Sequence, residues 1–271
     1  MKLIIINVVV FIAANLFIGL SKLSNSSTDL LFSTVALAPD LTSFLGHFWT
    51  LFTYMFVHIE LFHVLFNLLW LYWMGQLFVE FIGSKQLIST YIFGGIFGGV
   101  LFLISGYLFP AVLGGAPLVG ASAGVMAVVI AIAFLIPNYT LSLFLIGPVK
   151  LKYIALVSFV LSTIIDFYTN TGGKIAHIGG ALYGYLFISL YRNGTDFGKP
   201  INAIIDWTEK LFSPKPKMTV TYRKPNDEDY NVGKRAAEKR VDEILDKISK
   251  SGYDSLSKDE KEFLFQQSGK K

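Results

Sequence analysis

Six long apolar stretches, separated by short polar segments, occupy the first 192 residues of the chain. Most of them are close to the roughly 20 helical residues that a hydrocarbon core requires. Helices are the expected spanning form, because a helix pairs its backbone polar groups within its own segment. The pattern therefore predicts an all-α polytopic membrane protein with transmembrane helices near residues 3–20, 54–80, 87–109, 120–137, 150–168 and 175–192.

The first stretch, which follows Met1 and Lys2 and extends from Leu3 to Leu20, admits two interpretations. A secretory signal peptide also begins with a basic residue and an apolar run. However, no small-x-small cleavage site follows this run, and the run is long enough to span a membrane. We therefore expect an uncleaved first transmembrane helix.

The last 79 residues have a polar pattern that predicts an aqueous tail. Residues 193–233 are rich in Pro, Lys, Asp and Asn, which is typical of a linker. A first helix is predicted over 234–250, ending at Gly252. Its apolar face would consist of Val241, Ile244, Leu245 and Ile248. The tetrad Ser257-Lys258-Asp259-Glu260 fits a capping box that starts a second helix, with Phe263 and Leu264 on its apolar face.

The charges follow the same division of the chain. Residues 1–192 hold 12 of the 42 Asp, Glu, Lys and Arg residues, and residues 193–271 hold the other 30. This division predicts a membrane domain over 1–192, a linker over 193–233 and a small helical module over 234–271. In the tail, 16 basic residues accompany 14 acidic ones, so no nucleic-acid-binding surface is indicated. The chain has no cysteine, which excludes disulfides and thiolate chemistry.

The basic residues of the short loops predict the orientation in the membrane. On one side of the membrane, the loops carry Lys2, Lys85, Lys150, Lys152, Arg192 and Lys199. On the opposite side, the loops carry only Lys22 and Lys174. The positive-inside rule therefore predicts that both termini, and hence the tail, are cytoplasmic, most simply in the plasma (inner) membrane.

The first outer loop, roughly 21–53, is long and unusually apolar. Its apolar side chains include Leu41, Phe44, Leu45, Phe48, Trp49, Leu51 and Phe52. We expect the loop to lie in the membrane interface, where Trp is favoured. The alternative is a small folded extracellular loop with buried aromatic side chains.

Small residues recur at a spacing of four in three of the predicted helices. The third stretch contains Gly94-Gly95-Ile96-Phe97-Gly98-Gly99, which includes two overlapping G-x-x-x-G patterns. The pairs Gly120/Gly124 and Gly180/Gly184 repeat the spacing in the fourth and sixth stretches. Such residues allow close helix approach in lipid. The fourth and sixth helices are therefore predicted to pack closely together.

Four polar side chains are predicted to lie at one depth. With cytoplasmic termini, the second, fourth and sixth helices all run from outside to inside, so their early residues share an outer layer. Those residues are His63, Asn67, Ser122 and His177. Polar groups inside a span indicate function by default. A serine at a helix start has free backbone N–H groups nearby that suit an oxyanion, and a histidine is a suitable base.

Two other interpretations apply to these residues, a structural role and a metal site. Each serine or histidine taken alone could be a structural polar contact. A zinc site could use His58, His63 and His177. However, His58 and His63 are five apart, which places them poorly on one helix face. No H-E-x-x-H motif is present, and Glu60 is the only carboxylate at that depth.

Taken together, these motifs resemble the rhomboid intramembrane serine proteases over roughly residues 1–192. The second stretch has the H-x4-H-x3-N pattern, and Gly120-Ala121-Ser122 resembles the start of G-x-S-G. The sixth stretch has the A-H-x2-G-x3-G pattern. Trp49, nine residues before His58, fits the loop tryptophan of the family. The residues of these patterns are His58, His63, Asn67, Ala176, His177, Gly180 and Gly184.

The resemblance implies a six-helix rhomboid fold and a Ser–His dyad that cleaves single-span membrane proteins without a cofactor. Ser122 would be the nucleophile, and His177 the general base and then acid. His63, Asn67 and the Ser122 backbone N–H would form the oxyanion hole. His58 would have a structural role, through bonds within the first loop.

Three residues differ from the family pattern. Ala123 follows the nucleophile, where the family usually has Gly, and a helical conformation would tolerate its methyl. Thr50 follows Trp49, where Arg is usual. Met126 lies where an aromatic side chain often stacks on the catalytic histidine, and its thioether could substitute in part.

Two other functions compete with proteolysis. A non-proteolytic rhomboid-like protein would bind membrane proteins, but such relatives usually lack the dyad. A small-solute transporter would need polar residues at the midplane. The polar groups here lie on the outer side, and the inner half is nearly purely apolar. The substrate and the partner of the tail are not indicated.

Overall fold

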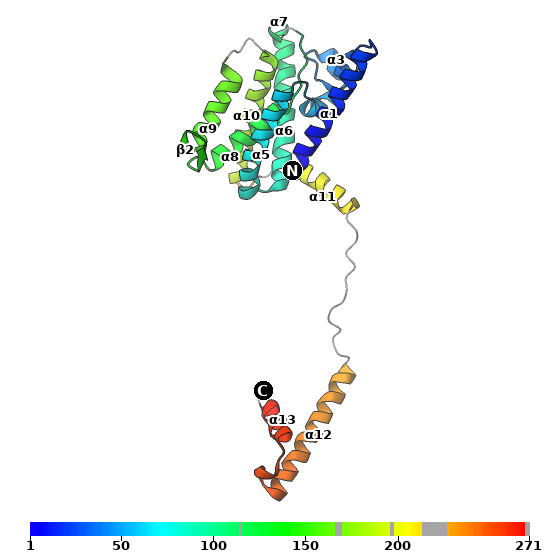
Figure 1. Cartoon of the computed structure of the whole chain (residues 1–271), viewed down its shortest axis with the longest axis vertical. Coiled ribbons are helices and arrows are strands. Elements are labelled where there is room, and N and C mark those ends of the chain that lie inside the picture. Colours follow the sequence, from blue (N-terminus) through cyan, green and yellow to red (C-terminus); the bar gives the residue numbers. More distant parts are fainter. Residues whose placement is uncertain (114, 166–169, 196–197, 213–226, 269–271) are drawn as a thin grey trace. The chain divides into compact units, whose positions relative to one another are not determined.

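The computed structural model describes the chain apart from residues 114, 166–169, 196–197, 213–226 and 269–271 (Figure 1). It consists of two compact units, Met1–Ser213 and Pro214–Lys271. The longer helices of the first unit are α1 (Lys2–Leu23), α5 (Leu61–Phe81), α6 (Ser84–Leu108), α8 (Ser122–Leu135), α9 (Leu151–Phe159), α10 (Thr171–Arg192) and α11 (Lys199–Phe212). Its short helices are α2 (Asp29–Val35), α3 (Leu41–Gly46), α4 (Thr50–Thr53), η1 (Tyr54–Phe56), α7 (Pro110–Leu113) and η2 (Val160–Ile164).

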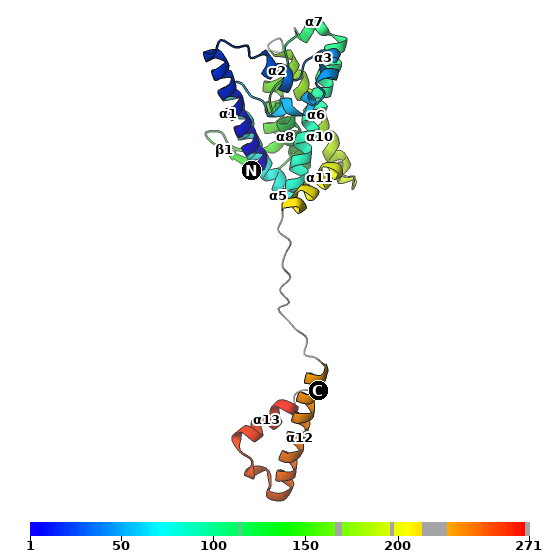
Figure 2. The same cartoon turned by 90° about the vertical axis from the view of Figure 1, so that its right-hand side faces the viewer.

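Helix α8 is the centre of the first unit. Every residue from Ala123 to Ala133 is buried, and α5, α6, α9 and α10 all contact it (Figures 1 and 2). This burial follows from its sequence, because α8 contains no charged residue and is hydrophobic on all sides. The helix that carries Ser122 is therefore surrounded by protein.

Glycines bring α6 and α10 into main-chain contact with α8. A Cβ atom at Gly180 would lie 2.0 Å from the Ala123 carbonyl oxygen, and one at Gly184 would lie 2.3 Å from that of Ala127. The predicted close packing of the fourth and sixth helices is therefore present. Gly124, however, faces α6, where its Cβ would lie 2.6 Å from the Tyr91 carbonyl oxygen.

Three of the described helices, α1, α5 and α6, are long and apolar enough to cross a membrane by length and composition. The segments Ser122–Leu135 and Leu151–Ile164 are apolar but shorter. The second helix begins at Leu61, later than the predicted residue 54, because η1 and an extended segment precede it. His58 therefore lies outside the helix, which corrects its placement within the second span.

A β-hairpin after α8 was not predicted. Strands β1 (Thr140–Leu143) and β2 (Gly147–Lys150) pair antiparallel. The turn places Leu145 at a φ of 68°, and the tip residues Phe144 and Leu145 are each 90% exposed. Each strand has only four residues, which is too short for an alternation of apolar and polar residues to distinguish a strand from a loop. In Figure 1 the hairpin, the N-terminus and α11 lie at one end of this unit, and α3 and α7 lie at the other.

The first loop folds into α2, α3, α4 and η1. Phe48 is 67% exposed and Phe52 is 45% exposed, whereas Tyr54 and Phe56 of η1 are buried. The alternative with buried aromatics is therefore wrong for Phe48 and Phe52. The Trp49 indole nitrogen donates to the Thr34 carbonyl at 2.8 Å, and the Thr50 hydroxyl donates to the His47 carbonyl at 2.6 Å.

The second unit contains α12 (Asp227–Ser251), η3 (Tyr253–Ser255) and α13 (Lys258–Ser268). The predicted capping box is present, since the Ser257 N–H donates to Glu260 Oε2 at 2.7 Å and the Glu260 N–H donates to Ser257 Oγ at 3.3 Å. Two helices of the tail depart from the predicted pattern. Helix α11 lies within 193–233, and α12 begins seven residues before the predicted start at 234. The predicted linker residues 196–197 and 213–226 lie outside the described residues.

Candidate active site

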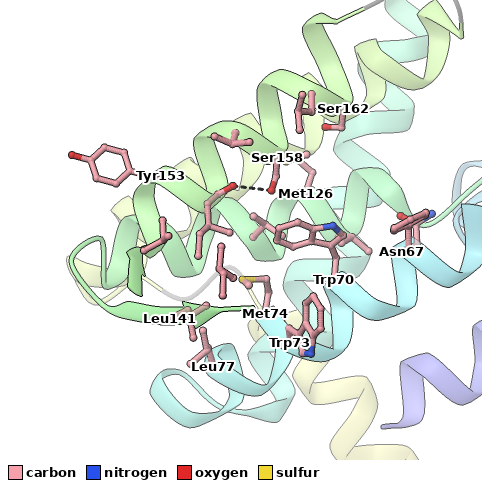
Figure 3. Close-up of a pocket in the computed structure, with 18 of the residues that line it drawn as sticks. Asn67, Trp70, Trp73, Met74, Leu77, Met126, Leu141, Tyr153, Ser158 and Ser162 are labelled. Atoms are coloured by element: carbon pink, nitrogen blue, oxygen red, sulfur yellow. Dashed lines mark hydrogen bonds between the residues drawn. The ribbon is translucent and has the colours of Figure 1, made fainter. Parts of the chain in front are cut away.

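A cavity of about 1340 Å³ lies between α5, α8, α9 and α10, with the β1–β2 hairpin at one end. Figure 3 shows Asn67, Trp70, Trp73, Met74 and Leu77 from α5 on one side, and Tyr153, Ser158 and Ser162 from α9 and η2 on the other. The lining is mostly apolar. His63, Asn67, Ser122 and His177 all line this cavity. The structure thus brings together the four polar side chains that the sequence predicted at one depth.

Ser122 is the first residue of α8, and four hydrogen bonds hold the main chain of the segment before it. Leu118 and Leu37 exchange backbone hydrogen bonds of 2.8 and 3.0 Å. The Gly120 N–H donates to the Tyr54 carbonyl at 2.9 Å, and the Ala121 N–H donates to His58 Nε2 at 3.1 Å. The Ser122 N–H belongs to the first helical turn and has no intrahelical partner. The nucleophile candidate is therefore held by a fixed loop next to a free donor.

Gly120 allows His63 to approach this loop. Its φ is +116°, which favours glycine, and a Cβ atom there would lie 2.8 Å from His63 Cε1. His63 is thereby packed directly against the residue two before Ser122. Glycine is therefore favoured at position 120 of the Gly-x-Ser pattern for two reasons: its positive φ and the space that it leaves for the His63 ring.

His58 holds both the loop before Ser122 and the side chain of Asn67. Because His58 Nε2 accepts the Ala121 N–H, that nitrogen must be unprotonated, and Nδ1 carries the proton. The same Nε2 lies 3.2 Å from Asn67 Nδ2, so one N–H of the Asn67 amide points at His58. The other N–H of this amide remains for the cavity. These two partners were not indicated by the sequence, and the bonding expected of the His58 ring within the first loop stays a prediction.

His177 lies in the second turn of α10 and contacts η2. Its Nδ1 lies 3.0 Å from the Ser162 carbonyl oxygen. A carbonyl only accepts, so Nδ1 must donate, and Nε2 is left as the basic nitrogen. Segment η2 is a π-helical turn, in which the Ile165 N–H reaches the Val160 carbonyl at 3.2 Å. Such turns occur often at functional sites.

The sequence did not reveal the Ser162 carbonyl as a partner of His177, because every residue type has a main-chain acceptor. The structure does not join Ser122 and His177 by a hydrogen bond among the described residues. Catalytic hydrogen bonds are often long without substrate. The side chains of the two residues nevertheless line the same cavity.

Two of the residues that differ from the family pattern have clear surroundings. Ala123 is 1% exposed, and its methyl packs on α6, where a Cβ at Gly98 would lie 2.7 Å from it. The small residue at Gly98 therefore accommodates the extra methyl. Met126, one turn after Ser122, is 7% exposed and lines the cavity together with His177.

The described residues contain no group of three or more His, Cys, Asp or Glu side chains that could hold a metal. His58 and His63 do approach each other, with ring centroids 5.2 Å apart. Because His58 Nε2 is occupied by the Ala121 N–H, this nitrogen is not available to a cation. The arrangement suits acyl transfer, since it places a serine, a basic imidazole nitrogen and amide donors around one space.

Comparison with known proteins shows the family to which the chain belongs. The Rhomboid domain family matches residues 45–194, and a family of unknown function (DUF6576) matches residues 226–270. The chain is 30% identical over 162 residues to "RHOMBOID-like protein 12, mitochondrial" of Arabidopsis thaliana. This match covers 55% of the chain and 48% of that relative, so the chain spans about half the length of the curated relative it matches. The chain belongs to the rhomboid family.

Proposed function

We propose that this chain is an intramembrane serine endopeptidase that cleaves single-span membrane proteins in or near the outer part of the membrane. Ser122 is the nucleophile and His177 is the general base. The observation that carries the proposal is that His63, Asn67, Ser122 and His177, from three helices, line one apolar cavity. Neither packing nor span formation requires these four groups to meet.

In the proposed reaction, His177 Nε2 accepts the proton of the Ser122 hydroxyl as Oγ attacks the substrate carbonyl carbon. The imidazolium then gives that proton to the leaving amine as the C–N bond breaks, and water hydrolyses the acyl-enzyme. The Ser162 carbonyl takes the orienting role that a carboxylate has in a triad, because it holds Nδ1–H. The nitrogen facing the reaction is therefore the basic one.

The oxyanion that forms in this reaction needs hydrogen-bond donors. The Ser122 N–H, His63 and the free N–H of Asn67 supply them in this proposal. His58 aligns Asn67 by accepting its other N–H, and the same nitrogen holds the loop before Ser122. Donors fixed in advance in an apolar site are the most effective form of such stabilisation.

The proposed membrane placement has six spans with both termini cytoplasmic. The short α8 is surrounded by other helices, so it does not need the length of a lipid-facing span. The loops that carry the basic residues adjoin the N-terminus, the start of α6, the hairpin and α11, which lie at one end of the unit. Ser122 begins α8 at the opposite end, which this orientation places on the outer side.

The test is cleavage of a co-expressed single-span reporter protein by the full chain. Ser122→Ala and His177→Ala should each abolish cleavage while the variants still insert and fold. Ser158→Ala is the matched control, because Ser158 lines the same cavity but its hydroxyl already donates to the Ile154 carbonyl at 2.8 Å. Cleavage by Ser122→Ala at the parent rate would disprove the proposal.

A non-proteolytic rhomboid-like protein is the second candidate. The missing Ser122–His177 hydrogen bond among the described residues favours it. A fluorophosphonate probe separates the two: labelling of Ser122 that is lost in His177→Ala supports the protease, and an unreactive Ser122 in folded protein supports the binding protein.

A further inference from the structure

The cavity that holds Ser122 continues along α5 to its far end. Asn67 and His63 line the end near Ser122, whereas Gln76, Leu77 and Glu80 line the other end beside the hairpin. Asn67 and Glu80 are thirteen residues apart on one helix, which corresponds to about 20 Å at about 1.5 Å per residue. The groove is thus long enough to accept a helical segment of another chain.

Glu80 is the only charged residue, histidines aside, among the described residues that line this groove. It is exposed, and none of the cations among the described residues pairs with it. Gln76 precedes it by four residues, so both side chains project from one face of α5. The apolar groove therefore ends in an unpaired carboxylate beside an amide, which suits a Lys or Arg side chain.

Two cations in this part of the unit have other partners. Lys85, at the start of α6, forms an ion pair with Asp206 of α11. Lys152 lines a second cavity on another side of α9, and its ammonium lies 5.2 Å from the centre of the Tyr153 ring. Glu80 is consequently available to a visiting chain.

The chemistry of single-span proteins supplies a matching partner. A span whose N-terminal side is outside carries Lys or Arg on its cytoplasmic flank. With its outer part at Ser122 and its axis along α5, such a span brings that flank to the end of the groove where Glu80 lies. Apolar lining over the length of the groove matches the span, and the carboxylate matches the basic flank.

We infer that Glu80 is a specificity-determining residue, which selects single-span substrates with an outer N-terminus and a basic cytoplasmic flank about 13 helical residues beyond the cleaved bond. This inference rests on the proposed proteolytic function. Glu80 does not touch the reacting atoms, so it acts on substrate selection and not on the chemical step.

The test uses co-expressed reporters whose flank carries three Lys, three Gln or three Glu residues. A cleavable signal peptide and a folded outer domain fix the reporter orientation, which protease protection verifies for each flank. The proteases are the full-length parent, Glu80→Gln, Glu80→Lys and a charge control, Glu243→Lys, on the exposed face of α12. Initial cleavage rates are compared at equal expression.

The parent should cleave the Lys reporter about two to five times faster than the Gln reporter, the size expected of an exposed ion pair. Glu80→Gln should remove this preference, and Glu80→Lys should reverse it in favour of the Glu reporter. Glu243→Lys should behave as the parent. Lengthening or shortening the reporter between the cleaved bond and the flank by three residues should also lower the rate for the parent, but not for Glu80→Gln.

The failure of this inference differs from failure of the proposed function. If the parent cleaves all three reporters, and the Lys preference is absent or survives in Glu80→Lys, the inference is wrong and the protease assignment stands. If the parent cleaves none of the reporters and equals Ser122→Ala, the proteolytic function itself is wrong.

Discussion

In the Met1–Ser213 unit the contact between α8 and α10 is made by main-chain atoms, whereas in the Pro214–Lys271 unit α12 and α13 are joined by charged side chains. Gly180 and Gly184 lie directly against carbonyl groups of α8. In the second unit, Lys247 Nζ lies 2.9 Å from Glu260 Oε1, and the Arg240 guanidinium lies 4.8 Å from the centre of the Phe263 ring.

The difference follows from the two solvents. In lipid there is little hydrophobic drive between helices, so close van der Waals packing and small residues hold them together. In water a short helical pair has a small core, here Ile244 and Leu256, and caps and charges supplement it. The first unit should therefore respond to changes of shape, and the second to changes of charge.

The largest effect is expected from Gly180→Ala, which tests the main-chain contact. Its Cβ would meet the Ala123 carbonyl oxygen at 2.0 Å, and backbone on both sides prevents relief. Overpacking of this kind should destabilise the first unit by about 3 kcal/mol or more. Thermal unfolding in detergent measures it, and Gly19→Ala in α1, where a Cβ meets no atom within 4 Å, is the control. Unfolding of Gly180→Ala at the parent temperature would show that the helices are not in main-chain contact.

Deletion of Leu161 tests shape at the π-helical turn. Removing one residue should convert η2 to an α-helix and move the carbonyl that holds His177. We expect kcat to fall by about 100-fold with KM little changed, since a misoriented base in a serine protease costs as much as about 10⁴-fold. Ser162→Ala keeps the carbonyl and should retain activity. Equal kinetics for the deletion and the parent would exclude the carbonyl as the orienting group.

Ala123→Gly is a smaller change of shape, at the contact between α8 and α6. It removes the methyl that packs against Gly98 and places a glycine in a helix. The expected loss is about 1–2 kcal/mol of unfolding free energy. Reporter cleavage should persist, because no catalytic group changes. An increase in stability would show that this methyl is strained and not accommodated by Gly98.

The smallest effect concerns charge in the second unit. Hydrogen bonds from Lys247 and then from the Ser257 N–H hold the pKa of the Glu260 carboxyl below its ordinary value of 4.5. A lowered pKa stabilises the folded unit above the ordinary value, and this stabilisation is lost as the pH falls through the folded-state pKa. Hydrogen-exchange protection factors in α13, corrected for the intrinsic pH dependence of amide exchange, should fall on acidification from pH 7 to pH 3, while those in α8 change little.

Glu260→Gln should remove most of this pH dependence, and the matched control Glu238→Gln, on the exposed part of α12, should leave it intact. A larger loss of protection in α8 than in α13 on acidification would contradict the division between shape and charge.

Local signals could be predicted from the sequence. The Ser257–Glu260 capping box and the helix end at Gly252 depend on residues within one turn, so the pattern contains the whole interaction. The long apolar helices could also be predicted, because their composition is a local signal, but those helix ends that depend on other segments could not. The start of the second helix at Leu61 is such a case.

The interactions that build the candidate site are of another kind. Ala121 with His58, Gly180 with Ala123, and His177 with the Ser162 carbonyl each join segments far apart in the chain. All three pairs use a main-chain atom, which every residue has. The residue types at the site could be predicted, but their partners could not.

The hydrogen bond between His177 and the π-helical turn has a consequence for the order of events. Helix α9 and the turn form one wall of the cavity, so a substrate that enters by displacing this wall also carries away the carbonyl that orients the imidazole. While the wall is open, the histidine loses its fixed tautomer. In the proposed reaction, admission of a substrate and cleavage of its bond are therefore separated in time, because the base is oriented only once the wall has closed.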